Sequence, residues 1–170
     1  YRWGEEISIS ATPATGGSFA TWSQTSGTTS TFGDATSATT TFTMPTSDAT
    51  IYADGEPQTF TCTKEYRLQN ADGTYPSTYT SDGTETLDYN TTCTYTKSET
   101  NYQTQQDTAT MTEDQTISLD LPRNTYELTI NKNDTYISSV TGANTYRWGE
   151  EISISATPAT GGSFATWSQT

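Results

Sequence analysis

The two cysteines of this chain, Cys62 and Cys93, carry its most reactive side chains. Each lies in a threonine-rich run, Cys62 two residues after Phe60 and Cys93 two residues before Tyr95, so period-two alternation predicts that both point inward. They could form a disulfide or remain as two buried thiols. In a small β-module of an extracellular protein, an even cysteine count favours the disulfide. That bond would close a loop of about 30 residues and stabilise the fold by roughly 3 kcal/mol.

Catalytic chemistry lacks its usual side chains in this sequence. The chain contains no histidine, which removes the commonest general base and the commonest metal ligand. It also leaves no imidazole to activate a cysteine thiol. The acidic pair Glu5-Glu6 stands beside a turn signal and is interpreted as solvated. We therefore expect no enzyme activity, no catalytic residues, no metal site and no cofactor.

Several side chains could take a covalent modification. Asn90-Thr91-Thr92 and Asn133-Asp134-Thr135 match the acceptor pattern for N-linked glycosylation. The alternative is that both asparagines lie on ordinary solvated strand faces. Lys64, Lys97 and Lys132 have asparagines available in the chain for isopeptide cross-links, which would also need a buried acid beside each pair.

The stretch Asn70-Ala71-Asp72-Gly73-Thr74 admits two interpretations. It resembles an oxygen-rich calcium loop, but such a site needs about six to eight oxygen ligands, and no glutamate follows at the spacing of an EF-hand. Asp-Gly pairs also favour tight hairpin turns, because glycine accepts positive φ. We interpret the three pairs at 54–55, 72–73 and 82–83 as turns.

The chain repeats itself without a single change. Residues 1–25 and residues 146–170 share the sequence YRWGEEISISATPATGGSFATWSQT, at an offset of 145 residues. Such identity implies a recent duplication, and a fixed period is typical of arrays whose units contact chiefly their neighbours. The chain is interpreted as one full repeat of 145 residues plus the start of the next, a window of something longer.

Composition limits the classes of partner. The net charge is −13, from 20 acidic and 7 basic residues, and the basic residues form no patch. Nucleic-acid binding requires clustered positive charge, so we expect neither a nucleic-acid partner nor an anionic membrane surface. No run approaches the roughly 20 apolar residues that span a bilayer, and we expect no membrane insertion in this segment.

Alternation with period two predicts an all-β fold. The repeated segment alternates at Ile7, Ile9 and Ala11, and again at Ile152, Ile154 and Ala156. Similar runs occupy 40–44, 49–53, 117–121 and 126–130, and each has about the usual strand length. We predict tandem modules of small β-sheets, either grasp-like or sandwich-like, in a repeat array. The predicted boundaries are 1–55, 56–124 and 125–170.

The repeated segment resembles the divergent InlB B-repeat, a bacterial surface module of the Listeria–Bacteroides type. The likeness rests on Glu5-Glu6, the alternating strand through Ala11, Pro13 and Gly16, then Phe19 and Trp22. Residues 41–45 and 48–53 resemble the closing strands of that family, and residues 126–131 its opening strand. Gly17 departs from the pattern, where an aromatic residue often follows the glycine. By this resemblance, residues 1–55 are the C-terminal part of one such module and residues 125–170 the N-terminal part of the next.

The middle module, 56–124, resembles the MucBP type of mucin-binding repeat. The likeness rests on tyrosines and one turn: Tyr66, Asp72-Gly73-Thr74, Tyr89, Tyr95 and Tyr102. Both families are small β-rich folds in secreted and wall-anchored proteins, serving as adhesins or spacers. The resemblance therefore implies an extracellular, microbial cell-surface location.

The aromatic residues of the InlB-like modules could form cores or stack on sugars. In the resembled family the tryptophan of the Phe-x-x-Trp pattern is core, which implies that role for Trp22 and Trp167. Trp3 and Trp148 are expected at a module junction. The predicted core and junction set is Trp3, Phe19, Trp22, Phe42, Trp148, Phe164 and Trp167.

Two functions remain open from the sequence. The first is a structural unit of an extended extracellular fibre, filament or stalk, whose partners are neighbouring repeats and identical chains. The second is an adhesin repeat that binds host or environmental glycans through exposed tyrosine and tryptophan, with repetition multiplying weak contacts.

Overall fold

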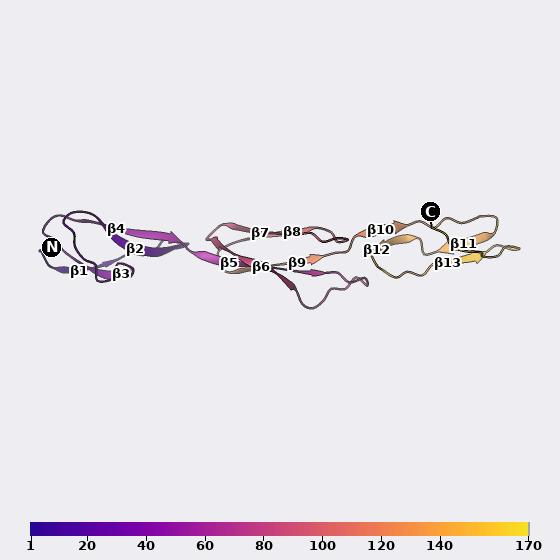
Figure 1. The fold of residues 1–170 in the computed structure, drawn as a ribbon, viewed down its shortest axis with the longest axis horizontal. Coiled ribbons are helices and arrows are strands. Elements are labelled where there is room, and N and C mark those ends of the chain that lie inside the picture. Colours follow the sequence, from indigo (N-terminus) through magenta and orange to yellow (C-terminus); the bar gives the residue numbers. More distant parts are fainter. Residues whose placement is uncertain (170) are drawn as a thin grey trace. The chain divides into compact units, whose positions relative to one another are not determined.

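The computed structural model describes residues 1–169, and the regular structure in that range is β-strand (Figure 1). In chain order the strands are β1 (Glu6–Ser10), β2 (Gly17–Ser26), β3 (Thr39–Thr43), β4 (Thr50–Pro57), β5 (Thr59–Leu68), β6 (Thr80–Asp88), β7 (Thr92–Lys97), β8 (Gln105–Thr110), β9 (Gln115–Leu121), β10 (Thr125–Leu128), β11 (Ile137–Thr141), β12 (Asn144–Arg147) and β13 (Ser155–Pro158).

The strands form small sheets of two or three members. Antiparallel pairs join β1 to β3, β2 to β4, β10 to β12 and β11 to β13. The middle segment contributes a three-stranded sheet of order β6-β5-β9 and a two-stranded sheet of β7 and β8. The prediction of an all-β fold of small tandem sheets is confirmed. Contacts divide the chain into two compact units, and the division crosses the middle strands, so that both units contain parts of them.

The first unit comprises residues 1–63, 84–93 and 108–116. In its repeated module, Trp22 and Phe42 are buried. The Trp22 indole donates a hydrogen bond to the carbonyl oxygen of Ser37 at 3.0 Å, which satisfies its one polar atom. Phe42 packs against Phe32 with 5.1 Å between ring centroids. In the adjoining middle segment, the buried residues are Cys62 on β5, Cys93 on β7 and Met111, which directly follows β8.

The second unit comprises residues 64–83 and 94–107, together with the chain from Ile117 onward. Its buried side chains are Tyr95 on β7 and three alternate residues of β9, namely Ile117, Leu119 and Leu121. This alternation matches the strand predicted at 117–121. Within 125–169, by contrast, no described residue is fully buried. That stretch has strands but no closed apolar core.

Two of the three predicted Asp-Gly turns are wrong. Asp72-Gly73 does form a turn, but Asp54-Gly55 lies inside β4 and Asp82-Gly83 inside β6. Gly55 pairs with Phe19 beside an irregularity in the β2–β4 register. A Cβ atom on Gly55 would lie 2.9 Å from the Ser18 carbonyl oxygen. The glycine at 55 therefore serves close backbone approach at a bulge and not a change of direction.

The second copy of the repeated segment, residues 146–170, departs from the predicted alternation. Ile152 and Ile154 lie outside strands, and β13 begins only at Ser155. In the first copy, residues 1–25, the same isoleucines belong to β1, which is paired with β3. A strand needs a partner for its backbone groups as well as an alternating sequence. Among the described residues, no strand pairs with residues 151–154.

Candidate functional site

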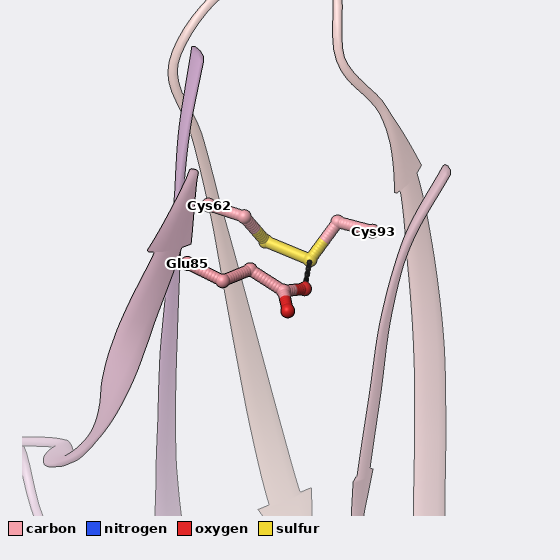
Figure 2. Close-up of side chains that lie close together, drawn as sticks. All are labelled: Cys62, Glu85 and Cys93. Atoms are coloured by element: carbon pink, nitrogen blue, oxygen red, sulfur yellow. Dashed lines mark hydrogen bonds between the residues drawn. A yellow bond between two sulfur atoms is a disulfide. The ribbon is translucent and has the colours of Figure 1, made fainter. Parts of the chain in front are cut away.

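Cys62 on β5 and Cys93 on β7 form a disulfide in the first unit, so of the two alternatives the structure has the bond and not two thiols. The sulfur atoms are 2.04 Å apart, the Cα atoms 6.5 Å apart, and neither residue is exposed to solvent. The bond joins a strand of the three-stranded sheet to a strand of the two-stranded sheet (Figure 2). The disulfide therefore cross-links these two sheets in a region whose apolar core is small.

Glu85 on β6 lies beside this bond. Its Oε1 atom is 3.2 Å from the Cys93 sulfur, as Figure 2 shows. Among the described residues, Cys62, Glu85 and Cys93 are the group close enough together to share a metal ion. Cysteine binds metal as the thiolate, and here each sulfur is bonded to the other. The cluster is therefore a disulfide with a neighbouring carboxylate.

A lysine in the second unit is held by acids and an aromatic ring. Lys97 Nζ lies 3.0 Å from Asp82 and 3.3 Å from Glu99, and 4.1 Å from the centre of the Tyr66 ring. The hydrogen bond to Asp82 raises the pKa of Lys97 above its ordinary value. An isopeptide bond requires a neutral amine as nucleophile, so this environment disfavours Lys97 in that reaction.

Asp82 also accepts a hydrogen bond from the Tyr95 hydroxyl at 3.0 Å. The bonds from Lys97 and Tyr95 lower the pKa of Asp82. Burial, followed by the bond to Asp82, raises the pKa of the Tyr95 phenol. These groups form one network that ties the end of β7 to β6, and it is maintained by an ionised carboxylate.

A second network surrounds Arg67 on β5. Its guanidinium donates to both carboxylate oxygens of Asp120 on β9, at 2.6 and 2.9 Å. The same guanidinium lies 5.2 Å from the Tyr75 ring centre and 4.6 Å from that of Tyr79, and the Tyr79 hydroxyl donates to Asp120. Sequence reasoning missed this cluster, because Arg67 and Asp120 are 53 residues apart and neither belongs to a recognisable motif.

The connection between the first module and the middle strands lies within the first unit. Gln58 is the one residue between β4 and β5. Its amide donates to the Gly16 carbonyl at 2.9 Å, and its carbonyl accepts from the Tyr89 amide at 2.7 Å. The Tyr89 ring lies so close to Gly16 that a Cβ atom there would be 1.9 Å from the ring. The one residue between β4 and β5 is thus hydrogen-bonded through both of its backbone groups.

The connection into the last module lies within the second unit. The Arg123 guanidinium lies 4.9 Å from the Trp148 ring centre and 5.6 Å from that of Tyr102. It donates to the carbonyl oxygens of Trp148 at 2.7 Å and Gln69 at 2.8 Å. The Trp148 amide donates to the Asn124 carbonyl at 2.8 Å. Trp148 thus contacts Arg123 beside this connection, and its role at a module junction stays a prediction; sequence reasoning missed Arg123.

The other predicted aromatics fall into two groups. In the first copy, Trp22 is 8 % exposed and contacts Phe19, with ring centroids 5.5 Å apart, whereas Trp3 is 77 % exposed. In the second copy, Phe164 and Trp167 keep the same contact at 5.3 Å but are 42 % and 41 % exposed. The segment that covers Trp22 has no counterpart beside Trp167 among the described residues, so the core role of Trp167 stays a prediction.

The predicted modification and turn residues lie on the surface. Asn90 is exposed with a φ of 63°, and Asn133 is exposed with its side-chain oxygen bonded to the Thr135 amide. Glycosylation of either stays a prediction. Asp72 Oδ1 accepts hydrogen bonds from the Thr74 amide and hydroxyl, which lower the pKa of Asp72. This carboxylate oxygen closes the hairpin turn, in agreement with the turn interpretation.

Comparison with known families decides the identity of the repeated module. The profile of the divergent InlB B-repeat domain matches residues 1–58 and 126–170, more than half of the chain. The chain belongs to the divergent InlB B-repeat family. The resemblance seen in the sequence is thereby confirmed for both copies. No curated protein matches the chain, and no solved structure does so either.

The divergent InlB B-repeat is a surface repeat domain of bacteria, and the disulfide fits an extracellular location. The described residues contain no helix that is long and apolar enough to cross a membrane. Residues 59–125 lie outside the family match, so the MucBP-like interpretation of the middle module stays a prediction, as do the three predicted module boundaries.

Proposed function

We propose that this divergent InlB B-repeat chain is a structural unit of an extended extracellular fibre or stalk on a microbial surface. Its partners are then neighbouring repeats of the same protein, and identical chains in a filament. The observation that carries the proposal is the construction of the two module connections. Both connections are short and are hydrogen-bonded to residues on each side. They can therefore transmit tension without first being straightened.

The first connection is a single residue. Pro57 ends β4, Thr59 begins β5, and both backbone groups of Gln58 between them are hydrogen-bonded. The second runs from Leu121 at the end of β9 to Thr125 at the start of β10. Within it, the Asn124 amide donates to the Asn101 carbonyl at 2.8 Å, and the Arg123 side chain clasps Trp148. Flexible linkers, by contrast, are rich in glycine or serine and leave their backbone solvated.

The surface of the chain suits a fibre in water. The net charge of −13 repels neighbouring fibres and keeps them soluble. The disulfide between Cys62 and Cys93 shortens the chain path through the middle strands and resists their separation under load. A catalytic site has no comparable support, since the titratable clusters described above are joined to one another in structural networks.

The test is cryo-electron microscopy of the native, full-length protein from its source. The structural role predicts filaments with a regular axial repeat that corresponds to one 145-residue unit. Antibodies raised against the middle segment, 59–125, should then label the filament at that same period.

Isolated flexible beads without axial order would contradict the fibre proposal. In that case the adhesin alternative should be examined with the same preparation on a glycan array. Saturable binding that soluble sugar displaces, and that is lost on Trp3→Ala or Tyr52→Ala, would support the alternative, since both rings are exposed.

A further inference from the structure

Three groups of the kind that bind metal ions lie together in the first unit. They are the sulfurs of Cys62 and Cys93 and the carboxylate of Glu85, and their ligand atoms all lie within 4.8 Å of one another. With the disulfide closed, the two sulfurs are bonded to each other and offer no thiolate. Every chain, however, carries two thiols before this bond is first made. The reduced form therefore has a chemistry that the disulfide form lacks.

Three different strands hold these groups in place. Cys62 lies on β5, the central strand of the three-stranded sheet, and Glu85 lies on its neighbour β6. Cys93 lies on β7, in the two-stranded sheet. Figure 2 shows the three side chains pointing toward one another from these strands. Reduction of the disulfide breaks no backbone hydrogen bond, so the strands should keep the three groups close together.

The spacing of the two cysteines suits two ligands of one ion. A tetrahedral zinc ion with bonds of about 2.3 Å to sulfur holds two sulfur ligands about 3.8 Å apart. The Cα atoms of Cys62 and Cys93 are 6.5 Å apart. Two cysteine side chains can span this separation at that sulfur distance after rotation about their Cα–Cβ bonds. The strands themselves need not move.

The carboxylate of Glu85 already stands near a ligand position. A sulfur and an oxygen bound to the same tetrahedral zinc ion lie about 3.6 Å apart. Glu85 Oε1 lies 3.2 Å from the Cys93 sulfur. Both atoms are rich in electrons, so a cation between a thiolate and this oxygen would be attracted by both. The third ligand is therefore in place before any metal arrives.

The environment of the cluster strengthens the binding of a cation. Both cysteines are fully buried, and Glu85 is half-buried. Attraction between a cation and anionic ligands is stronger in such a place than in water, because the effective dielectric constant is lower. The half-buried carboxylate also gives the cluster one side that is open to solvent. An ion and its bound water can enter from that side.

The set of ligands selects zinc among the common biological cations. Ca²⁺ and Mg²⁺ take oxygen ligands, and Ca²⁺ needs about six or more of them. Thiolates favour zinc and Cu(I), but Cu(I) does not share the affinity of zinc for carboxylate. Two thiolates and one carboxylate leave the fourth tetrahedral position to a water molecule.

We propose that the reduced chain binds one zinc ion through Cys62, Cys93 and Glu85. A dithiol opens the disulfide by supplying two electrons and two protons, and is itself oxidised to a disulfide. Zinc then displaces the two thiol protons and forms a bond to each sulfur, while Glu85 supplies the third ligand. The disulfide form and the zinc form are thus alternative states in which β5 and β7 are cross-linked. This site does not depend on the proposed role in a fibre.

The first experiment uses the complete 170-residue chain. A phosphine opens the disulfide and is oxidised to the phosphine oxide, and the reagent is then removed under nitrogen. Co²⁺, added as a spectroscopic probe, should give a sulfur-to-cobalt charge-transfer band and the visible absorption of tetrahedral cobalt, with saturation at one ion per chain. Zinc should displace the cobalt. The chain with its disulfide intact is the control and should give no band; no band from the reduced chain, or equal bands from both, would overturn the proposal.

Substitution of the carboxylate tests its role as a ligand. Glu85→Gln should weaken the affinity of the reduced chain for zinc by at least about tenfold and change the cobalt spectrum. Glu65→Gln is the matched control, because Glu65 lies on β5 outside the cluster and accepts a hydrogen bond from Ser118 at 2.6 Å. That variant should leave the affinity unchanged. Equal affinities of the Glu85→Gln chain and the natural chain would overturn the proposed site.

A stability measurement separates this site from two thiols that capture metal in an unfolded chain. A ligand of the folded state raises the midpoint of thermal unfolding, whereas a ligand of the unfolded state lowers it. Zinc should therefore raise the midpoint of the reduced natural chain and leave that of the Cys62→Ala/Cys93→Ala chain unchanged. If reduction alone unfolds the chain, zinc should restore its β-sheet circular dichroism. A lowered midpoint, or a sheet signal that zinc does not restore, would contradict the proposal.

Discussion

At the scale of single residues, the disulfide between Cys62 and Cys93 should stabilise the fold by restricting the unfolded chain. It links cysteines separated by 31 positions, and a loop of that length implies about 3 to 4 kcal/mol from the restricted unfolded chain. We expect the Cys62→Ala/Cys93→Ala chain to lose that much unfolding free energy, measured by urea denaturation. Glu85→Gln, which keeps the bond, is the control and should change the midpoint far less. An unchanged midpoint in the double variant would mean that the bond restrains little.

The Asp82 network predicts a loss of stability in acid. Lys97 and Tyr95 hold the pKa of Asp82 below its ordinary 3.8, so near that pH the unfolded state binds more protons than the folded state. The contribution of Asp82 is therefore present above about pH 4 and is lost as the pH falls through the lowered pKa. Urea midpoints between pH 7 and pH 2 should show this decline. The Asp82→Asn chain should be less stable at pH 7 and show a shallower decline; identical slopes would contradict the assignment.

At the scale of elements, substitution of the glycine in the turn before β2 tests whether the connection between β4 and β5 is tightly packed. Gly16 has a φ of +77°, and an added Cβ atom would lie 1.9 Å from the Tyr89 ring. Gly161, its counterpart in the second copy, has a φ of +80° and open space around it. Positive φ costs alanine about 1 kcal/mol or more at either site, but only Gly16→Ala also displaces Tyr89. Calorimetry should therefore show the larger loss for Gly16→Ala. A Tyr89→Ala background should reduce the difference, and equal losses in the natural background would argue against tight packing.

Sequence patterns predicted several strands correctly and failed where the presence of a partner strand decides the structure. Alternation predicted β1, β3 and β9 correctly: alternate residues of β1 are half-buried, Phe42 of β3 is buried, and so are alternate residues of β9. The same letters at 152–154 form no strand, since a strand also needs a neighbour for its backbone groups. Asp-Gly pairs at 54–55 and 82–83 lie within strands, because glycine also permits bulges and close backbone approach.

The candidate site was predictable to a similar extent. The cysteine pair was favoured over two buried thiols by the even cysteine count and the inward alternation, both of which are visible in the sequence. The contacts of Arg67 with Asp120 and of Arg123 with Trp148 were not predictable. They join residues 53 and 25 positions apart, and they depend on which strands become neighbours. Single arginines in a chain rich in tyrosine were the one available signal, since guanidinium groups stack on aromatic rings.

At the scale of the whole molecule, the repeated segment and the folded module begin at different points in the chain. A module that uses every pairing seen in the two copies would begin near Thr125, include the repeated segment once, and end with a segment like residues 26–58. Each copy of the segment would then be the shared centre of a module, with strands added on both sides. Both copies match one family, and the strands that pair with the first copy follow it in the chain, whereas those that pair with the second copy precede it.

A structural role in a fibre under tension predicts how the chain extends under force. With the disulfide intact, the residues between Cys62 and Cys93 cannot lengthen when the chain is pulled from its ends. Thirty-one residue steps of about 3.5 Å correspond to roughly 100 Å of hidden length. Single-molecule pulling should therefore show a contour about 100 Å longer after reduction. The Cys62→Ala/Cys93→Ala chain should show the longer contour without a reductant, and a contour that reduction leaves unchanged would mean that the bond does not lie in the path of the load.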